Sequence, residues 1–156
     1  METQDHGDRI LILGASFAGL DTALSLADLL RRKAAPKPSI TLIDRKNFLL
    51  FTAFLAEVAS NRLSPLAIAP PIRRIIGRRE IDFHQTTVED IDLEKRQVRT
   101  PAGIFDYDHL VLALGSVNNY FGNEDFHRYG FSYKTMGDAL RLRNHVIDLL
   151  ETAWTR

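Results

Sequence analysis

The stretch "ILILGASFAGLDTALSLADLL", residues 10–30, decides how this chain folds. Its first four residues are an unbroken apolar run, which is typical of a strand buried on both faces of a parallel sheet. From Phe17 onward the apolar residues change to helical spacing and share one stripe. They are Phe17, Leu20, Leu24, Ala27 and Leu30. A glycine turn separates the two patterns, so we predict a strand, a tight turn and a helix in that order.

A second strand is predicted at "ITLID", Ile40–Asp44, after a basic connector that contains two prolines. Strand, glycine turn, helix and strand together make a βαβ unit. Further on, "HLVLALGS" (His109–Ser116) predicts another buried strand, and "RQVRTPAGIFDYD" predicts a hairpin around the turn "TPAG". The expected fold class is therefore α/β, a Rossmann-like parallel sheet with flanking helices and a small β-hairpin or meander.

Two helical signals follow from residue spacing. Phe48, Phe51 and Phe54 lie three residues apart in a nearly apolar segment and would share one helix face. Their simplest role is core packing. Thr135 and Asp138 form a capping pattern in front of a long apolar period. We therefore predict a domain over residues 1–134 and a separate helix over 135–156.

Composition excludes several classes of function. Lys+Arg and Asp+Glu both number 20 in 156 residues, and this balance argues against nucleic acid as a partner. The chain has no cysteine, so disulfides and thiolate chemistry are excluded within it. Its five histidines show no metal-ligand spacing, and no metal site is predicted. The first nine residues do not resemble a leader, and no apolar run reaches the roughly 18 residues of a membrane span. We expect a cytoplasmic protein.

The glycine turn has the form G-x-S-x-x-G. In the dinucleotide fingerprint the first glycine permits the turn, the second lets the backbone approach the pyrophosphate, and the third allows close packing of helix and strand. Gly14 and Gly19 hold the first and third places, and Ser16 holds the second. A small side chain can be accommodated there, and its hydroxyl could donate to a phosphate. By itself the motif leaves a nucleotide site and a purely structural turn equally open.

Asp44 favours the nucleotide site. An acidic residue at the end of the second strand can accept hydrogen bonds from ribose hydroxyls. Asp44 lies 25 residues after Gly19, and the proline-containing connector explains the excess over the usual spacing of about 20. A solvated strand end is the other interpretation of Asp44. Both features occur in one βαβ unit, and together they predict nucleotide binding.

The chain resembles the N-terminal part of type II NADH:quinone oxidoreductases, within the superfamily of pyridine nucleotide-disulfide oxidoreductase-like flavoproteins. The matching segments occur in the family's order and are "ILILGASFAGLDTALSL", "ITLIDRKNFLLFTAFLAEVASNRLSP", "IAPPIRRII", "VEDIDLEKRQV", "YDHLVLALGSVNNYFG" and "KTMGDALRLRNHV". The glycine loop is shared by many families, but the combination of "NFLLFTAFL", "LALGSVNNYFG" and "DALRLRN" is more specific. The resemblance implies an FAD-binding Rossmann-like domain over residues 1–134, with the helix over 135–156 leading toward an NADH-binding domain.

The resemblance also implies which residues would contact FAD. Gly14, Ser16, Phe17, Ala18 and Gly19 would face its pyrophosphate. Asp44 would bind the adenosine ribose with Arg45 beside it, and the Val88 backbone would meet the adenine. Ala113, Leu114 and Gly115 would pass the cofactor at a strand end, and Phe51 and Thr52 would lie near the isoalloxazine ring. No catalytic acid or base is assigned.

The family's reaction passes a hydride from NADH to FAD and electrons to a membrane quinone. We expect this chain to be the FAD-binding portion of such an enzyme, truncated before the NADH domain, with at most peripheral contact with the inner face of the cell membrane. A homodimer is compatible with the resemblance. The alternative is a stand-alone nucleotide-binding or interaction module without redox activity. Ser16, and Ala53-Phe54 where the family commonly has Pro-Leu, depart from the family pattern.

Overall fold

The computed structural model describes residues 7–31 and 36–155. These residues divide into two compact units. The first contains the described residues up to Leu49 together with Pro71–Gly115, and the second contains Leu50–Pro70 and the described residues from Ser116 onward. The expectations for the first nine residues and for the basic connector fall partly on residues 1–6 and 32–35, which lie outside the described ranges.

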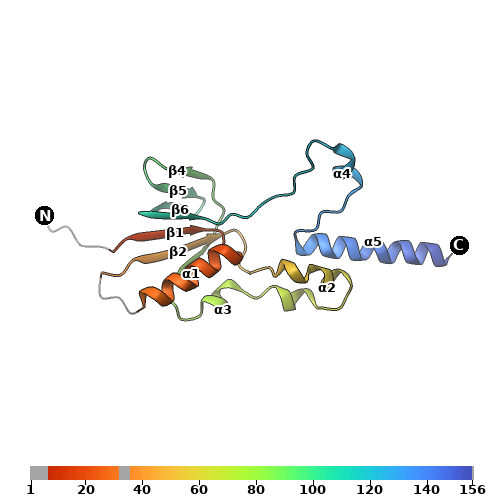
Figure 1. Ribbon diagram of the computed structural model, residues 1–156, viewed down its shortest axis with the longest axis horizontal. Helices are drawn as coiled ribbons and strands as arrows, with labels where there is room; N and C mark the ends of the chain where they lie inside the picture. Colours follow the sequence, from red (N-terminus) through yellow and green to blue (C-terminus); the bar gives the residue numbers. More distant parts are fainter. Residues whose placement is uncertain (1–6, 32–35, 156) are drawn as a thin grey trace. The chain divides into compact units, whose positions relative to one another are not determined.

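A four-stranded parallel sheet forms the centre of the first unit (Figure 1). Its order is β3-β2-β1-β7, with β1 at Arg9–Leu13, β2 at Ser39–Asp44, β3 at Asp82–Gln85 and β7 at His109–Leu112. β1 lies between β2 and β7, and all three pairings are parallel. The predicted α/β class with a parallel sheet is confirmed.

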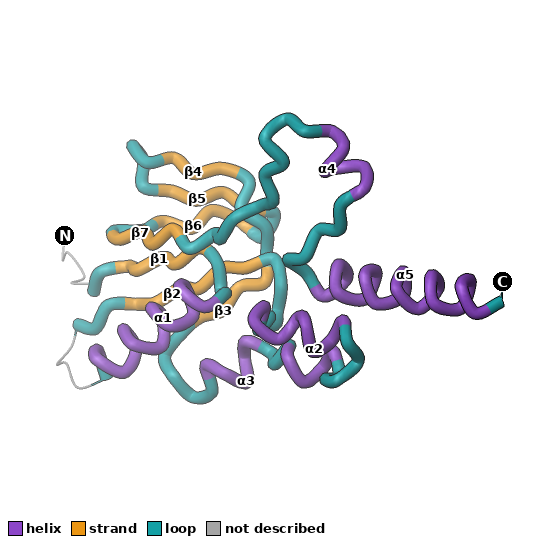
Figure 2. The backbone as a smooth tube through the Cα atoms, turned by 45° about the vertical axis from the view of Figure 1, so that its right-hand side comes forward, coloured by secondary structure: helices purple, strands orange, loops and turns teal. Residues whose placement is uncertain are grey.

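Helix α1, Phe17–Leu30, connects β1 to β2 and buries Gly19, Leu20 and Ala23. It begins and ends where the sequence pattern predicts. The short helix α3, Ile72–Ile76, follows Pro71 and ends at Gly77, whose φ of 60° favours glycine. The arrangement places the amino end of α1 directly after the carboxyl end of β1 (Figure 2).

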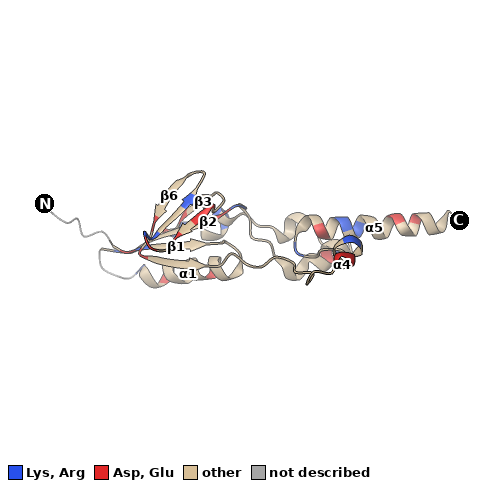
Figure 3. Ribbon diagram, turned by 90° about the horizontal axis from the view of Figure 1, so that it is seen from above, with Lys and Arg blue, Asp and Glu red and all other residues tan. Residues whose placement is uncertain are grey.

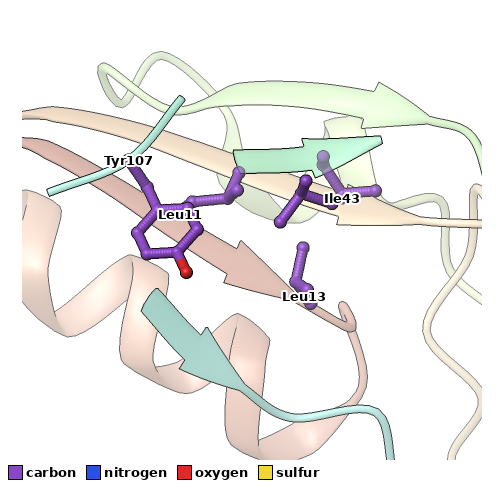
Figure 4. Packing of buried hydrophobic residues seen from close by; sticks show 5 residues of the cluster. Leu11, Leu13, Ile43 and Tyr107 are labelled. Carbon is purple, nitrogen blue, oxygen red and sulfur yellow. The ribbon is translucent and has the colours of Figure 1, made fainter. Parts of the chain in front are cut away.

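The core of the first unit lies between the parallel sheet and a small antiparallel meander. The meander consists of β4 (Asp90–Asp92), β5 (Gln97–Thr100) and β6 (Gly103–Asp106), in the order β4-β5-β6. Leu11, Leu13 and Ile43 from the parallel strands pack with Val98 and Tyr107 (Figure 4). Because side chains alternate along a strand, Ile12 of β1 points to the opposite face, and it is fully buried there.

The second unit is helical. It contains the 3₁₀ turns η1 (Thr52–Phe54) and η2 (Pro65–Ile68) and the helices α2 (Leu55–Ala59), α4 (Glu124–Tyr129) and α5 (Met136–Trp154). α2 packs against α5. The predicted cap of α5 is present, because the Thr135 hydroxyl accepts from the Asp138 amide and the Asp138 carboxylate accepts from the Thr135 amide.

Two details differ from the sequence expectations. Phe48 shares no helix with Phe51 and Phe54, because it forms an isolated β-bridge with Pro71 and the helical turns begin only at Thr52. The strand predicted over residues 109–116 ends at Leu112, and Leu112 is 60% exposed. β7 is an edge strand of the described sheet, so only part of its apolar surface is covered. None of the described helices combines the length and apolar character that a membrane span requires.

Candidate nucleotide-binding site

The glycine loop lies at the carboxyl end of β1, which lies between β2 and β7 in the sheet. The Gly14 amide donates to the Ile43 carbonyl at 2.7 Å, which ties the loop to β2. Gly14 has a φ of +102°, and a Cβ there would overlap the Ala113 carbonyl. Both the backbone angle and the close approach therefore require glycine at this position.

Gly19 lies in the first turn of α1 and has no room for a side chain. A Cβ on Gly19 would overlap the Gly14 carbonyl oxygen and would lie 3.1 Å from the Cβ of Ala113. The absence of a Cβ lets the first turn of α1 lie directly on the loop and on the end of β7. This is the close packing that the third glycine of the fingerprint provides.

Ser16 occupies the position where the usual motif has glycine. Its φ of −86° and ψ of −163° are extended backbone angles that any residue adopts, so the turn itself does not require glycine here. Its side chain makes no cap hydrogen bond with α1, and Ser16, Phe17 and Ala18 are all exposed. The amino end of a 14-residue helix is therefore open to solvent, without an acidic side chain in its first turn. Such an end favours an anion.

Asp44 is bonded to the glycine loop. Its Oδ2 accepts from the Ala15 amide at 2.7 Å, and its Oδ1 accepts from the Lys46 amide at 2.8 Å. The side chain is half-buried at the carboxyl end of β2. The sequence indicated Asp44 but not Ala15 or Lys46, because backbone donors leave no signal in residue type.

Other predicted residues of the first unit lie in the segments that follow the strands. Arg45 is exposed, and its carbonyl accepts from the Gln85 side chain. Val88 is half-buried and packs on the core beneath the meander. The Ala113 amide donates to the Leu13 carbonyl at 2.8 Å. After it, Leu114 is 61% exposed and Gly115 takes a φ of +77°. The structure thus brings Gly14, Gly19, Asp44 and Ala113 together at the carboxyl edge of the sheet.

Phe51 and Thr52 belong to the second unit. The Phe51 amide donates to the Ile68 carbonyl at 2.9 Å, and its ring lies 6.4 Å from that of Phe54 at a 40° tilt. Thr52 is exposed at the start of η1. These contacts fix the local position of the pair within the second unit. In residues 7–31 and 36–155, no three histidine or acidic side chains are grouped in a way that could hold a metal ion.

The chain is similar in sequence to known oxidoreductases. A family model described as pyridine nucleotide-disulphide oxidoreductase matches residues 8–150. The type II NADH:quinone oxidoreductase of Staphylococcus aureus strain NCTC 8325 is 31% identical over 140 residues, which are 90% of this chain and 34% of that protein. The protein of the same name from Staphylococcus saprophyticus is 29% identical over 140 residues, again 90% of this chain and 34% of that protein. The chain spans about a third of the length of these curated relatives.

Solved structures share the fold. The sulfide:quinone oxidoreductase of Aquifex aeolicus superposes with a TM-score of 0.82 at 25% identity, over 93% of this chain and 33% of that one. The structure of NDH2 from Plasmodium falciparum in complex with NADH gives a TM-score of 0.77 at 24% identity, over 95% of this chain and 30% of that one. At 24% identity, the similarity to NDH2 shows that the fold is shared and nothing more.

Proposed function

We propose that this chain, which belongs to the pyridine nucleotide-disulphide oxidoreductase family, binds FAD at the glycine loop as part of a flavin-dependent NADH:quinone-type oxidoreductase. One observation carries the proposal. The loop at the end of β1 is hydrogen-bonded to the carboxylate at the end of β2, and the amino end of α1 is exposed beside them. Ligands of open α/β sheets bind at the carboxyl ends of the strands.

The pyrophosphate of FAD would lie against the loop. Gly14 and Gly19 let the loop pack against the end of β7 and the first turn of α1 pack on the loop, and Ser16 adds one exposed hydroxyl that can donate to a phosphate oxygen. Phe17 and Ala18 begin the first turn of α1, which directly follows the loop. The positive end of the helix dipole would then stabilise the phosphate charge.

The adenosine ribose would lie at Asp44. A carboxylate offers about four lone-pair sites, and Ala15 and Lys46 occupy one site on each oxygen. Asp44 can therefore hold the loop and accept from ribose hydroxyls at the same time. Arg45 lies beside it with its side chain in solvent.

The remaining contacts follow from the family pattern. We place the adenine at the Val88 backbone, the middle of the cofactor along Ala113, Leu114 and Gly115, and the isoalloxazine ring near Phe51 and Thr52. A bound flavin would supply hydride acceptance and electron release, and the protein would supply position and electrostatics. We also propose that residues 1–134 form the FAD-binding domain and that the helix over 135–156 leads out of it.

The substrates of the whole protein are proposed from its relatives. Two of them are named for NADH and quinone, and a third is named for sulfide and quinone. This chain contains no cysteine, so its 156 residues offer no thiolate for chemistry at sulfur. We therefore favour NADH as the electron donor and quinone as the acceptor. A membrane quinone would place the whole protein at the inner face of the cell membrane.

Titration of the purified chain with FAD tests the proposal. We expect the flavin absorbance bands to shift and the flavin fluorescence to change in a saturable way. Asp44→Ala should weaken FAD binding by about tenfold or more, because it removes a charged acceptor and frees the Ala15 amide. Asp21→Ala is the matched control, since Asp21 is an exposed aspartate of α1 that lies after the first turn of the helix. A folded chain, verified by circular dichroism, that retains no flavin would refute the FAD site.

A further inference from the structure

A small cavity lies at the carboxyl end of helix α1, in the first unit. Because α1 runs antiparallel to the strands, this end of the helix lies beside the amino end of β2, and the glycine loop lies at the opposite end of the strands (Figure 1). The volume of the cavity is about 290 Å³. It is lined by Ala27, Asp28, Arg31, Arg78, Arg79 and Glu80. None of these residues belongs to the proposed FAD site.

The basic side chains of this cavity come from the segments that follow two helices. Helix α1 itself contains acidic residues but no basic ones (Figure 3). Arg31 directly follows α1, and Arg78 and Arg79 lie in the connection between α3 and β3. Buried Ile76 and Ile81 flank this connection. Its backbone is also held, because the Arg79 amide donates to the Ile76 carbonyl at 3.2 Å and the Ile81 amide donates to the Arg79 carbonyl at 2.8 Å.

Both carboxylates of the cavity already have basic partners. Arg79 donates to the two Asp28 oxygens, from Nε at 3.1 Å and from Nη2 at 3.3 Å, which is the bidentate arrangement. The Lys37 ammonium, just before β2, lies 3.7 Å from the Glu80 carboxylate. These two pairs neutralise the acidic side chains. They also connect the end of α1 and the start of β2 to the segment between α3 and β3.

Arg31 and Arg78 are the two arginines of the cavity whose charge is left over. Neither forms an ion pair with any residue that the structure describes. The hydrogen bond from Arg79 lowers the pKa of Asp28, and the charge of Arg31 acts in the same direction, so Arg31 lies close to this carboxylate. The carboxyl end of α1 carries roughly half a negative charge. This partial charge offsets only part of the two guanidinium charges, and the cavity therefore has an excess of positive charge.

We propose that this cavity binds a small phosphate-bearing anion between Arg31 and Arg78. A guanidinium group offers donors in a planar fork that matches phosphate oxygens, and two such groups can hold one phosphate from two sides. The cavity volume is at the lower limit of small-molecule pockets, which is about 300 Å³. We therefore expect pyrophosphate or a phosphate monoester in place of a whole dinucleotide. The proposal does not depend on the FAD site, because the two sites share no residue.

Isothermal titration calorimetry of the full chain with inorganic pyrophosphate tests the proposal. The titration is made at low ionic strength and with FAD in excess, because pyrophosphate would otherwise compete for the glycine loop. We expect saturable binding to one site. Arg31→Ala and Arg78→Ala should each weaken this binding by about tenfold, because each removes one of the two free charged donors. Arg78→Lys keeps the charge but loses the fork, and it should weaken binding by about threefold.

Arg74→Ala is the matched control for a general effect of charge. Arg74 is an exposed arginine of α3, but it does not line the cavity. Its replacement removes the same charge from the same region of the chain. Because charges in solvent are screened, the affinity for pyrophosphate should change by less than about twofold. Circular dichroism verifies the fold of each variant.

Lipid vesicles distinguish a soluble phosphate from a lipid headgroup as the source of the anion. Phosphatidic acid presents a phosphate monoester at the vesicle surface, whereas phosphatidylcholine has no net charge. If the chain sediments with phosphatidic acid vesicles only, and Arg31→Ala and Arg78→Ala remove this binding, the site takes a headgroup phosphate. If pyrophosphate binds and the vesicles do not, the site takes a soluble ligand. Either result supports a phosphate site at these two arginines.

Three outcomes would overturn the proposal. A folded chain that binds neither pyrophosphate nor phosphatidic acid vesicles has no such site. Equal weakening by Arg74→Ala and Arg78→Ala would show that only the overall charge matters. Pyrophosphate binding that FAD abolishes would belong to the glycine loop. A chain that binds no FAD but binds pyrophosphate through Arg78 would refute the FAD site alone and leave this proposal standing.

Discussion

Ser16 illustrates at the scale of one residue how backbone geometry decides whether a motif tolerates substitution. Its extended φ and ψ angles do not need glycine, whereas the φ of +102° at Gly14 does. The serine is therefore compatible with the turn, and its hydroxyl remains exposed for a ligand.

The first prediction concerns this residue. Ser16→Gly should change the free energy of unfolding by only about 0.3 kcal/mol, because glycine and serine differ little at a helix N-cap where the side chain makes no cap bond. FAD affinity should change by no more than about threefold. Urea unfolding and fluorescence titration measure both quantities. A loss of FAD affinity as large as that of Asp44→Ala would instead make the Ser16 hydroxyl a principal phosphate donor.

The packing of α1 on the glycine loop is decided at the scale of the element. At Gly19 the helix lies directly against the Gly14 carbonyl and the Ala113 side chain. Neither can move away without disturbing the sheet, since Ala113 and Gly14 are both hydrogen-bonded to neighbouring strands.

Gly19→Ala should therefore destabilise the first unit by about 3 kcal/mol, because the added methyl group collides with backbone. Gly137→Ala is the matched control on α5, where a Cβ would meet nothing closer than 3.6 Å. There the exchange should be neutral or should stabilise the helix by up to about 1 kcal/mol. Chemical unfolding of both variants measures the contrast, and equal effects would contradict the packing argument.

The start of α5 depends on one buried carboxylate. Asp138 is 3% exposed, and its Oδ2 accepts from the amides of Lys134 and Thr135 and from the Ser132 hydroxyl. Arg141 donates to its other oxygen. The residue thus fixes the chain that enters the helix as well as the helix itself.

Asp138→Ala should cost about 2 kcal/mol in the second unit, since it removes the N-terminal cap of α5 and leaves the Lys134 and Thr135 amides without their acceptor. Asp148→Ala, at an exposed position on the same helix, should change stability by less than about 0.5 kcal/mol. Amide hydrogen exchange of residues 132–140 locates the effect. Unchanged protection in the Asp138 variant would show that the cap is dispensable.

At the scale of the whole molecule, acid stability depends on two aspartates, one in each unit, whose pKa values are lowered to about 2. In the first unit, the Arg9 side chain and its amide hydrogen-bond Asp108 and lower the pKa of that carboxyl to about 2. In the second unit, burial raises the pKa of Asp138, but hydrogen bonds from Lys134, Thr135 and Ser132 outweigh burial and bring the pKa to about 2.

Acid should therefore destabilise the folded chain in a defined range. Both folded-state pKa values lie below the ordinary value of 3.8, so the unfolded chain binds protons first as the pH falls. The stabilisation is fully present above pH 3.8 and is lost as the pH falls toward about 2. Urea unfolding between neutral pH and pH 2 measures this dependence. Asp108→Asn and Asp138→Asn should each flatten it, and an unchanged slope in both would exclude these groups as its source.

The sequence by itself determined the local elements and their order. The apolar run before Gly14, the helical stripe from Phe17 and the Thr135–Asp138 cap predicted β1, α1 and α5, because these signals depend on neighbours within a few residues. The resemblance of longer segments indicated the family. The dinucleotide contacts of the candidate residues stay predictions.

The tertiary structure decided what depends on residues far apart in the chain. Only the fold brings the Asp44 carboxylate to the Ala15 amide, 29 positions earlier, and the Ala113 carbonyl to the Gly14 Cα. Only the strand order makes β7 an edge and leaves Leu112 exposed, although its sequence suggests burial. Phe48 likewise pairs with Pro71 in place of sharing a helix with Phe51. The physical reason is that burial and backbone hydrogen bonds depend on which segments meet, and residue spacing within one segment does not determine that.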